Sequence, residues 1–165
     1  MSTTSPKSIH TFQIDGLTGG QINFSDYAGK KILLVNVASQ CGLTAQYAQL
    51  EEMYRNFSDN FVIIACPANN FGAQEPGSNQ EIEQFCSTTY QISFPMTTKI
   101  SVKGNDMHSL YHFVTQKTLN GLQDSDVSWN FQKYIFDEAG YLTHVFAPTV
   151  EPADERILAA LDIQL

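Results

Sequence analysis

Long apolar runs are missing from this chain of 165 residues. No stretch approaches the ~18 consecutive apolar residues that span a bilayer, and the first residues, MSTTSPKSIHTF, lack the apolar core of a signal peptide. We therefore expect a cytoplasmic protein without stable membrane insertion.

Positive charge is also scarce. The chain has 9 Lys and Arg against 17 Asp and Glu, which gives a net charge of −8, and the basic residues form no cluster. Nucleic-acid affinity depends largely on Lys and Arg that neutralise phosphates, so we expect no nucleic-acid partner. Hydrophobic residues at 42% and charged residues at 16% are ordinary globular values, which exclude disorder and coiled coil.

Cysteine occurs three times, as Cys41, Cys66 and Cys86. Three cysteines do not make a stapling framework in a chain of this length, and the odd number suits reduced thiols with at most one reactive pair. His108 and His112 have the spacing of two metal ligands on a helix, but no third ligand accompanies them. We expect no metal and no cofactor.

The length predicts one domain over residues 9–165, preceded by a polar tail over residues 1–8. Two short alternating runs, residues 9–14 and 21–24, flank Gly-rich turn signals and predict an N-terminal hairpin.

Residues 32–35, 37 and 38 form an apolar run of the kind typical of a parallel strand covered on both faces. Apolar residues at helical spacing over residues 47–57 predict the next helix, with Glu51 on its solvent side. Residues 61–65 repeat the buried-strand pattern. This β-α-β order indicates an α/β fold with a central mixed sheet flanked by helices.

Turn formers and amides fill residues 68–77, after the second buried strand, where ligand sites of parallel sheets collect. Ser78 and Glu81 have the spacing of a capping box, which predicts a helix from there to about residue 90. The remaining predicted elements are a short strand over 97–102, a helix over 107–115, an irregular loop over 117–127, a hairpin of 131–136 with 141–146, and a last helix from Pro152.

Cys41 follows the first buried strand and is predicted to lie at the first turn of the next helix. Unpaired backbone N–H groups and the helix dipole favour a thiolate there, and the thiolate is the nucleophilic form. Cysteine is also among the most buried residue types, so packing is the alternative for Cys41 and the favoured reading of Cys66. Cys86 is predicted on the inward face of its helix. The lone Trp129 fits core packing with a satisfied N–H.

Three motifs carry a family resemblance. They are NVASQCGLT at residues 36–44, NNFGAQEPG at 69–77 and WNFQK at 129–133, and together they resemble the glutathione peroxidase family. The resemblance implies a thioredoxin-like fold, in agreement with the β-α-β order. It also implies that Cys41 is the peroxidatic cysteine and that Gln74, Trp129 and Asn130 are the polar groups around it.

The implied chemistry begins when the Cys41 thiolate attacks a peroxide oxygen and becomes a sulfenic acid. Neutral donors hold the developing charge without titrating. Cys86 stands where two-cysteine members of the family carry a resolving cysteine, recycled by thioredoxin. A disulfide needs Cα atoms roughly 4.4 to 6.8 Å apart, so the helix over 78–90 is expected to unwind in part. Ala68, Asn70 and Cys66 depart from the family pattern.

The resemblance implies an enzyme that reduces hydrogen peroxide and organic or lipid hydroperoxides in the response to oxidative stress. Residues 144–149 lack an arginine-tyrosine pair common in the family, which with the net charge of −8 disfavours glutathione as reductant. The segment over residues 117–127 is short compared with that of tetrameric members of the family, which favours a monomer. The alternatives are a glutathione-dependent peroxidase and an oxidant receptor that relays a disulfide to a partner protein. A metal chaperone would need Cys-x-x-x-Cys, and residue 45 is Ala.

Overall fold

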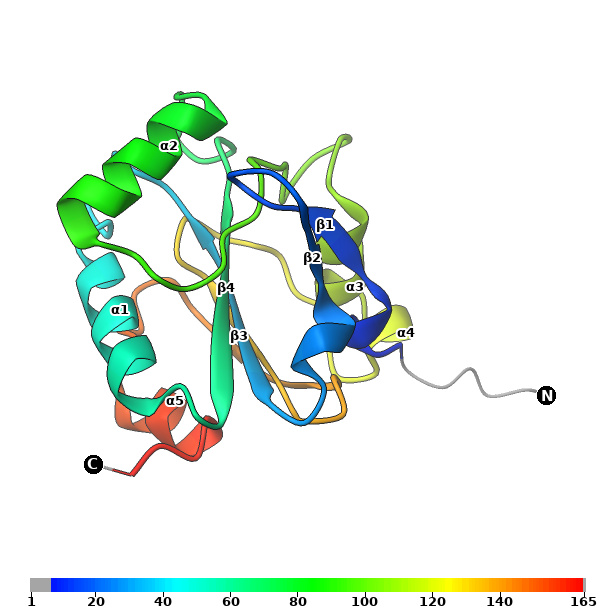
Figure 1. The fold of residues 1–165 in the computed structure, drawn as a ribbon. Coiled ribbons are helices and arrows are strands. Elements are labelled where there is room, and N and C mark those ends of the chain that lie inside the picture. Colours follow the sequence, from blue (N-terminus) through cyan, green and yellow to red (C-terminus); the bar gives the residue numbers. More distant parts are fainter. Residues whose placement is uncertain (1–6, 165) are drawn as a thin grey trace.

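The computed structural model describes residues 7–164 (Figure 1). In chain order the elements are β1 (Gln13–Asp15), β2 (Gln21–Asn23), β3 (Lys31–Val37), α1 (Gln46–Phe57), β4 (Phe61–Pro67), α2 (Asn79–Phe85), α3 (Ser109–Thr115), α4 (Lys117–Asn120), β5 (Lys133–Phe136), β6 (Leu142–Phe146) and α5 (Glu155–Ala160). Single 3-10 turns precede β1 and follow β2, and a π-helical turn, Cys86–Tyr90, extends α2.

A mixed sheet with the strand order β4-β3-β5-β6 forms the centre of the molecule. β3 runs parallel to β4 and antiparallel to β5, so Leu33 lies opposite both Ile63 and Ile135. β5 and β6 form the predicted C-terminal hairpin. The predicted N-terminal hairpin is also present, as the separate two-stranded sheet of β1 and β2.

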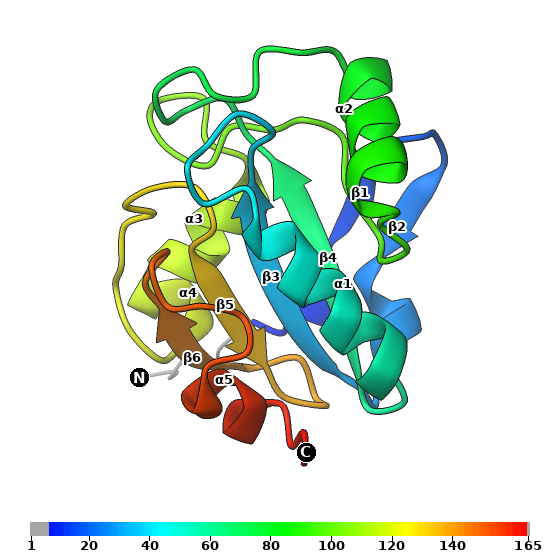
Figure 2. The ribbon, with the colours of Figure 1, turned by 90° about the vertical axis from the view of Figure 1, so that its left-hand side faces the viewer.

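The two faces of the sheet are covered by different elements, as the two views in Figures 1 and 2 show. Leu33 and Val35 of β3 belong to the core formed with α1, α2 and α5. Ile32 and Leu34, the alternate residues, belong to the core formed with the N-terminal hairpin and α3. All four side chains are fully buried, and each such burial contributes about 1.5–3 kcal/mol to folding. A continuous apolar strand is therefore what this two-sided environment requires.

The start of the described chain packs against two distant segments. Of the predicted polar tail over residues 1–8, only Lys7 and Ser8 lie within the described residues. The Lys7 N–H donates to the Leu119 carbonyl at 2.9 Å, and the Ser8 hydroxyl donates to the Ala139 carbonyl at 2.8 Å. These two residues are thus tied to the body of the fold.

The capping box of α2 is confirmed: the Ser78 hydroxyl and the Glu81 carboxylate each accept from the other residue's backbone N–H at 3.2 Å. The strand predicted over residues 97–102 is wrong. Met96 and Thr97 instead form isolated bridges, and the Thr97 N–H donates to the Ala65 carbonyl at 2.9 Å. This irregular segment covers the edge of β4 with single backbone hydrogen bonds and does not form a regular strand ladder.

Two further predictions were wrong. The loop over residues 117–127 contains the short helix α4, whose last residue, Asn120, donates through its amide to the Phe113 carbonyl at 3.0 Å. One helical turn is too short to show a 3.6-residue period in sequence. Glu51, predicted to face solvent, is buried and accepts hydrogen bonds from Arg55 and from the Ser93 N–H.

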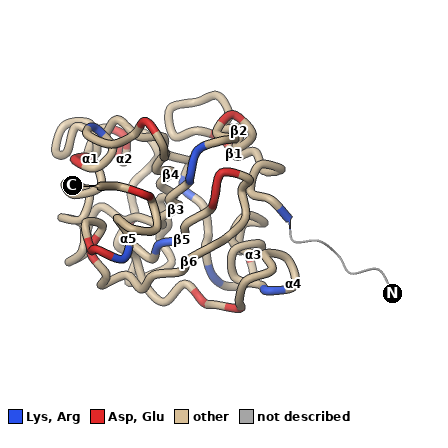
Figure 3. The backbone as a smooth tube through the Cα atoms, turned by 90° about the horizontal axis from the view of Figure 1, so that it is seen from below, with Lys and Arg blue, Asp and Glu red and all other residues tan. Residues whose placement is uncertain are grey.

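Within residues 7–164, no helix is both long enough and apolar enough to cross a membrane. The Lys and Arg residues of this part of the chain are spread over many elements rather than gathered in one tract (Figure 3).

Candidate active site

Cys41 lies in a tight turn between β3 and α1. The helix begins at Gln46, five residues after Cys41, so the prediction that Cys41 occupies the first helical turn was wrong. Thr44 holds this turn: its hydroxyl donates to the Ala38 carbonyl at 2.8 Å and accepts from the Cys41 N–H at 2.9 Å. The side chain of Thr44 therefore takes the place of helical hydrogen bonds at this point of the chain.

The sulfur of Cys41 is partly exposed and accepts a backbone hydrogen bond. The Leu43 N–H donates to the Cys41 Sγ at 3.3 Å. A fixed donor of this kind stabilises negative charge on sulfur and does not depend on a helix dipole. The local turn, rather than the helix start, thus supplies the electrostatic environment of the thiol.

Gln74 reaches the Cys41 turn through the backbone. The Gln40 N–H donates to the Gln74 carbonyl at 3.0 Å. The next residue, Glu75, accepts from the Ser39 N–H at 3.1 Å through its carboxylate. These two contacts fasten the loop after β4 to the residues that immediately precede Cys41.

Trp129 and Asn130 approach the same loop from the start of the β5 segment. The Asn130 amide is fully buried, and its Nδ2 donates to the Gln74 Oε1 at 3.1 Å. The Gln74 amide accepts through its oxygen, so its amino group keeps two N–H donors that no residue of 7–164 engages. The structure thus brings Gln74 and Asn130 into contact beside the Cys41 turn.

Trp129 does not pack in the core, which was the alternative interpretation of the sequence. Its side chain is 37% exposed, and its ring lies against Phe71 with the ring centroids 5.6 Å apart. Gly72 has a positive φ of 63°, and a Cβ there would lie 3.3 Å from the Trp129 ring. Glycine at this position therefore permits both the turn and the close approach of the indole.

Two buried polar residues hold the Trp129-Asn130 segment, and sequence reasoning missed both. Asn36 donates through Nδ2 to the Trp129 carbonyl at 3.1 Å, and its own carbonyl accepts from the Phe131 N–H. Lys133 is fully buried and donates to the Phe131 and Pro148 carbonyls at 2.7 and 3.1 Å. Burial lowers the pKa of Lys133 to about 7. A lone polar residue within an apolar strand was the available signal for Asn36, and the sequence around Lys133 carries no such signal.

Cys86 and Cys66 are both buried free thiols. Cys86 is 3% exposed, as its inward position on the helical stripe predicted, and burial raises its pKa to about 11. Cys66, in β4, is fully buried, and burial raises its pKa to about 12. Both thiols are therefore protonated at neutral pH.

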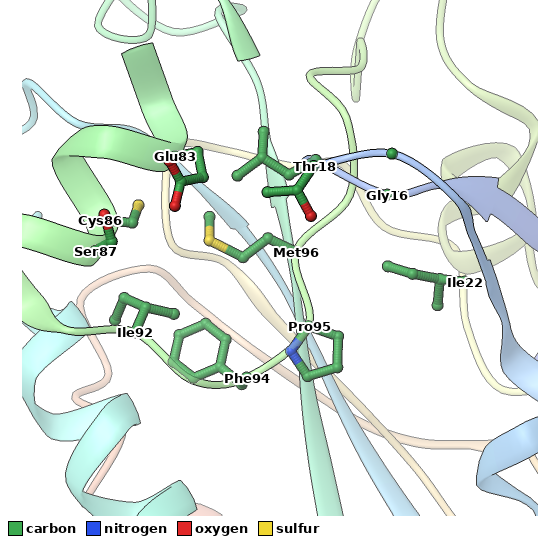
Figure 4. Close-up of a pocket in the computed structure, with 12 residues that line it drawn as sticks. Gly16, Thr18, Ile22, Glu83, Cys86, Ser87, Ile92, Phe94, Pro95 and Met96 are labelled. Carbon is green, nitrogen blue, oxygen red and sulfur yellow. The ribbon is translucent and has the colours of Figure 1, made fainter. Parts of the chain in front are cut away.

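A cavity of about 290 Å³ reaches Cys86 between α2 and the tip of the N-terminal hairpin (Figure 4). Apolar side chains, among them Phe94 and Met96, line most of it, and Glu83 points into it. Cys41, Gln74, Trp129 and Asn130 do not line it. The structure thus separates the sequence-predicted residues into two places, the Cys41 turn with its amides and the underside of α2 with Cys86.

Comparison with known proteins decides the family. The family model for glutathione peroxidase matches residues 9–115. The chain belongs to the glutathione peroxidase family. It is 40% identical over 154 residues to the probable phospholipid hydroperoxide glutathione peroxidase of Mesembryanthemum crystallinum, covering 92% of this chain and 90% of that protein. It is 36% identical to glutathione peroxidase-like peroxiredoxin 2 of Saccharomyces cerevisiae, covering 93% and 97%.

The glutathione peroxidase-like chain is accordingly a peroxidase, an enzyme of the oxidoreductase class. Its fold superposes on the crystal structure of Trgpx in apo form with a TM-score of 0.72 and 30% identity, covering 96% of this chain and 97% of that one. A thioredoxin-family thiol:disulfide interchange protein of Chlorobium tepidum, at 15% identity, gives a TM-score of 0.63 over 97% and 99% of the two chains. The predicted thioredoxin-like fold is therefore confirmed. Other relatives are named mitochondrial or chloroplastic proteins.

Proposed function

We propose that this peroxidase reduces hydrogen peroxide and organic or lipid hydroperoxides through a sulfenic acid on Cys41. The observation that carries the proposal is the hydrogen bond from Asn130 to Gln74 at 3.1 Å, made by a loop that is itself bonded to the Cys41 turn. Neutral amide donors beside a partly exposed thiol match the needs of a reaction that builds negative charge on a departing oxygen.

In the first step the Cys41 thiolate attacks one peroxide oxygen, the O–O bond breaks, and the other oxygen leaves as hydroxide or alkoxide. The amino group of Gln74, the Asn130 amide and the indole N–H of Trp129 are the donors for that charge. None of the three ionises near neutral pH, so they stabilise charge without themselves titrating.

The second step is proposed to be the attack of Cys86 on the Cys41 sulfenic acid, which forms a disulfide and releases water. Cys86 must leave its buried position to do this. The π-helical turn Cys86–Tyr90 ends in Gln91, which has a positive φ of 52°, and Ser87, Thr88 and Thr89 are exposed. Because this turn buries few side chains, its unwinding costs little compared with that of a core helix.

Thioredoxin is the proposed reductant of the disulfide. A protein disulfide that moves to the surface suits a dithiol protein, and the net charge of −8 opposes an acidic tripeptide. Near residues 144–149, Arg156 lies over the Phe146 ring at 6.0 Å and is paired with Asp154 at 3.0 Å. Because Arg156 is paired with Asp154, its charge is less available to bind the acidic tripeptide.

The test is NADPH-coupled turnover of hydrogen peroxide by the purified protein. One reaction contains thioredoxin with thioredoxin reductase, and the other contains glutathione with glutathione reductase. We expect turnover at least about 10-fold faster with thioredoxin at matched peroxide, since only that route uses Cys86. Faster turnover with glutathione would favour the glutathione-dependent alternative. Transfer of the disulfide to a partner protein without peroxidase turnover would favour the oxidant receptor.

We also propose a monomer in the cytoplasm. Residues 117–127 fold back on their own chain: the Lys117 N–H donates to the Asp124 Oδ1 at 2.8 Å and the Ser125 N–H to the Thr115 carbonyl at 3.0 Å. Light scattering after gel filtration tests the first part, and cell fractionation tests the second.

A further inference from the structure

Glu75 is a buried carboxylate that the steps above do not use. It is 1% exposed, and its Oε1 accepts from the Ser39 N–H at 3.1 Å. Its other oxygen, Oε2, is buried and makes no hydrogen bond with any described residue. An unpaired buried carboxylate oxygen costs free energy, so its presence calls for an explanation, and a catalytic role is one.

The surroundings of Glu75 join the two parts of the site. A cavity of about 340 Å³ is lined by Ser39 and Gln40 of the Cys41 turn, by Glu75, and by Ile82 and Phe85 of α2. Glu75 thus borders the space between the turn that carries Cys41 and the helix that ends next to Cys86. The buried hydroxyl of Ser39 also lacks a hydrogen-bond partner there.

The negative charge of Glu75 also acts on the Cys86 thiol. The carboxylate of Glu75 raises the pKa of Cys86, although burial is the larger cause and the Tyr47 hydroxyl acts in the opposite direction. The other charged group that faces Cys86 is Glu83 on α2 itself. Glu75 in turn has a pKa raised by burial, which the nearby Ser39 and the charge of Lys99 oppose.

The proposed second step needs a group that moves one proton. The Cys86 thiol is mostly protonated at neutral pH, both in its buried position, where its pKa is about 11, and at the ordinary value of 9.0 that an exposed thiol regains, and only a thiolate attacks a sulfenic acid. The sulfenic oxygen must also receive a proton to leave as water. Glu75 is a buried carboxylate with one unpaired oxygen, and it lies between the Cys41 turn and α2.

We propose that Glu75 takes the proton from the Cys86 thiol and delivers it to the oxygen that leaves Cys41. This inference rests on the proposed two-cysteine function. The Cys86 thiol gives its proton to the Oε2 of Glu75, and the resulting thiolate attacks the Cys41 sulfur. The S–S bond forms as the S–O bond breaks, the sulfenic sulfur is reduced while Cys86 is oxidised, and the leaving hydroxide takes the proton from Glu75 to become water.

Glu83 is the rival base, because it lies three residues before Cys86 on α2. It is half-buried and points into the cavity of Figure 4, and it travels with α2 when that helix end unwinds. Glu75 differs in that its Oε1 is fixed to the Cys41 turn through Ser39. It therefore stays at the place where the disulfide forms.

The experiment compares the wild type with Glu75→Gln, Glu75→Asp and Glu83→Gln. Each reduced protein is mixed with one equivalent of hydrogen peroxide and quenched at intervals, and mass spectrometry follows the Cys41 sulfenic acid and the Cys41–Cys86 disulfide separately. Glutamine retains an oxygen for the Ser39 N–H, so the Cys41 turn keeps its anchor. Glu83→Gln is the matched control.

In Glu75→Gln we expect sulfenic acid formation within about 2-fold of wild type and disulfide formation at least about 100-fold slower, the lower end of general acid–base effects. The slow rate should rise about tenfold per pH unit toward the pKa of the Cys86 thiol, whereas the wild-type rate stays nearly flat around neutral pH. Glu75→Asp should restore part of the flat profile, and Glu83→Gln should match the wild type.

Three results would overturn the proposal. Disulfide formation at the wild-type rate in Glu75→Gln would exclude the proton-transfer role of Glu75 and leave the two-cysteine function intact. So would equal slowing of both steps with a wild-type pH profile, which would mark a merely structural residue. If the wild type itself forms no Cys41–Cys86 disulfide, the two-cysteine function fails, and the role of Glu75 with it.

Discussion

The Cys41 turn and the end of α2 place a cysteine thiol in opposite environments. The turn leaves the Cys41 sulfur partly exposed and gives it the Leu43 N–H as donor. The end of α2 buries Cys86 to 3% exposure, and that burial raises its pKa to about 11. One thiol is thus partly accessible in this structure, and the other is buried.

The two regions also differ in how firmly they are held. Thr44 braces the Cys41 turn on two sides, and Gln74 is bonded to the residue before Cys41. The segment after α2 is a π-helical turn, a geometry with weaker packing that is frequent at functional sites. The proposed two-step reaction needs this difference, because Cys41 must be held in place while the segment around Cys86 unwinds.

The largest expected effect comes from Cys41→Ser. Loss of the nucleophilic sulfur should lower peroxide turnover by at least about 10³-fold, since a serine hydroxyl does not ionise near neutral pH. NADPH-coupled turnover measures this, with Cys66→Ser as the matched control. We expect Cys66→Ser to be nearly normal. Retained turnover in Cys41→Ser would erase the contrast between the two regions.

Cys86→Ser should separate the two steps. Cys41 should still form a sulfenic acid at the wild-type rate, while thioredoxin-driven turnover falls by at least about 10-fold because no disulfide forms. Stopped-flow oxidation and coupled turnover on the same preparation measure the two rates. Full thioredoxin-driven turnover in this variant would sink the two-cysteine scheme.

Gln74→Ala should weaken the Cys41 region alone. We expect peroxide oxidation of Cys41 to slow by about 100–1000-fold, the usual range for removal of one donor to a developing anion. The rate of disulfide formation should stay close to that of the wild type. Gln40→Ala, which removes an exposed amide next to Cys41 but keeps the backbone bond to Gln74, is the control. Equal oxidation rates in the two variants would show that the Gln74 side chain does not stabilise the departing oxygen.

The smallest effect concerns stability at high pH. The pKa of the buried Cys86 thiol is raised from 9.0 to about 11, so its stabilising contribution is complete below about pH 9 and is lost as the pH rises to 11. Urea unfolding of the reduced protein should therefore show a smaller loss of unfolding free energy between pH 9 and 11 in Cys86→Ser than in the wild type. An equal loss in both proteins would show that Cys86 is not buried in solution.

Sequence reasoning predicted the two parallel strands of the sheet well because they are apolar on both faces. The runs at residues 32–38 and 61–65 are β3 and β4, and the capping box at Ser78 starts α2. Prediction was wrong for Glu51, since its burial depends on Ser93, which is distant in sequence. It was also wrong for the short helix α4, which has too few residues for a period.

The candidate site could be predicted only in part. The motifs predicted that Cys41, Gln74 and Asn130 belong to one site, and the hydrogen bond between the two amides agrees with that grouping. The buried Lys133 and the unpaired oxygen of Glu75 were not visible, because burial and missing partners are properties of the fold.

Above all, we propose that Cys86 leaves its buried position and forms one disulfide with Cys41, which stays in its turn. The most direct test treats the reduced protein with one equivalent of hydrogen peroxide, blocks the remaining thiols and maps the digested protein by mass spectrometry. We predict a single intramolecular pair of peptides that joins Cys41 to Cys86, with Cys66 blocked as a free thiol. A sulfinic acid on Cys41 beside a free Cys86 thiol, or a pair that joins Cys41 to Cys66, would contradict the account.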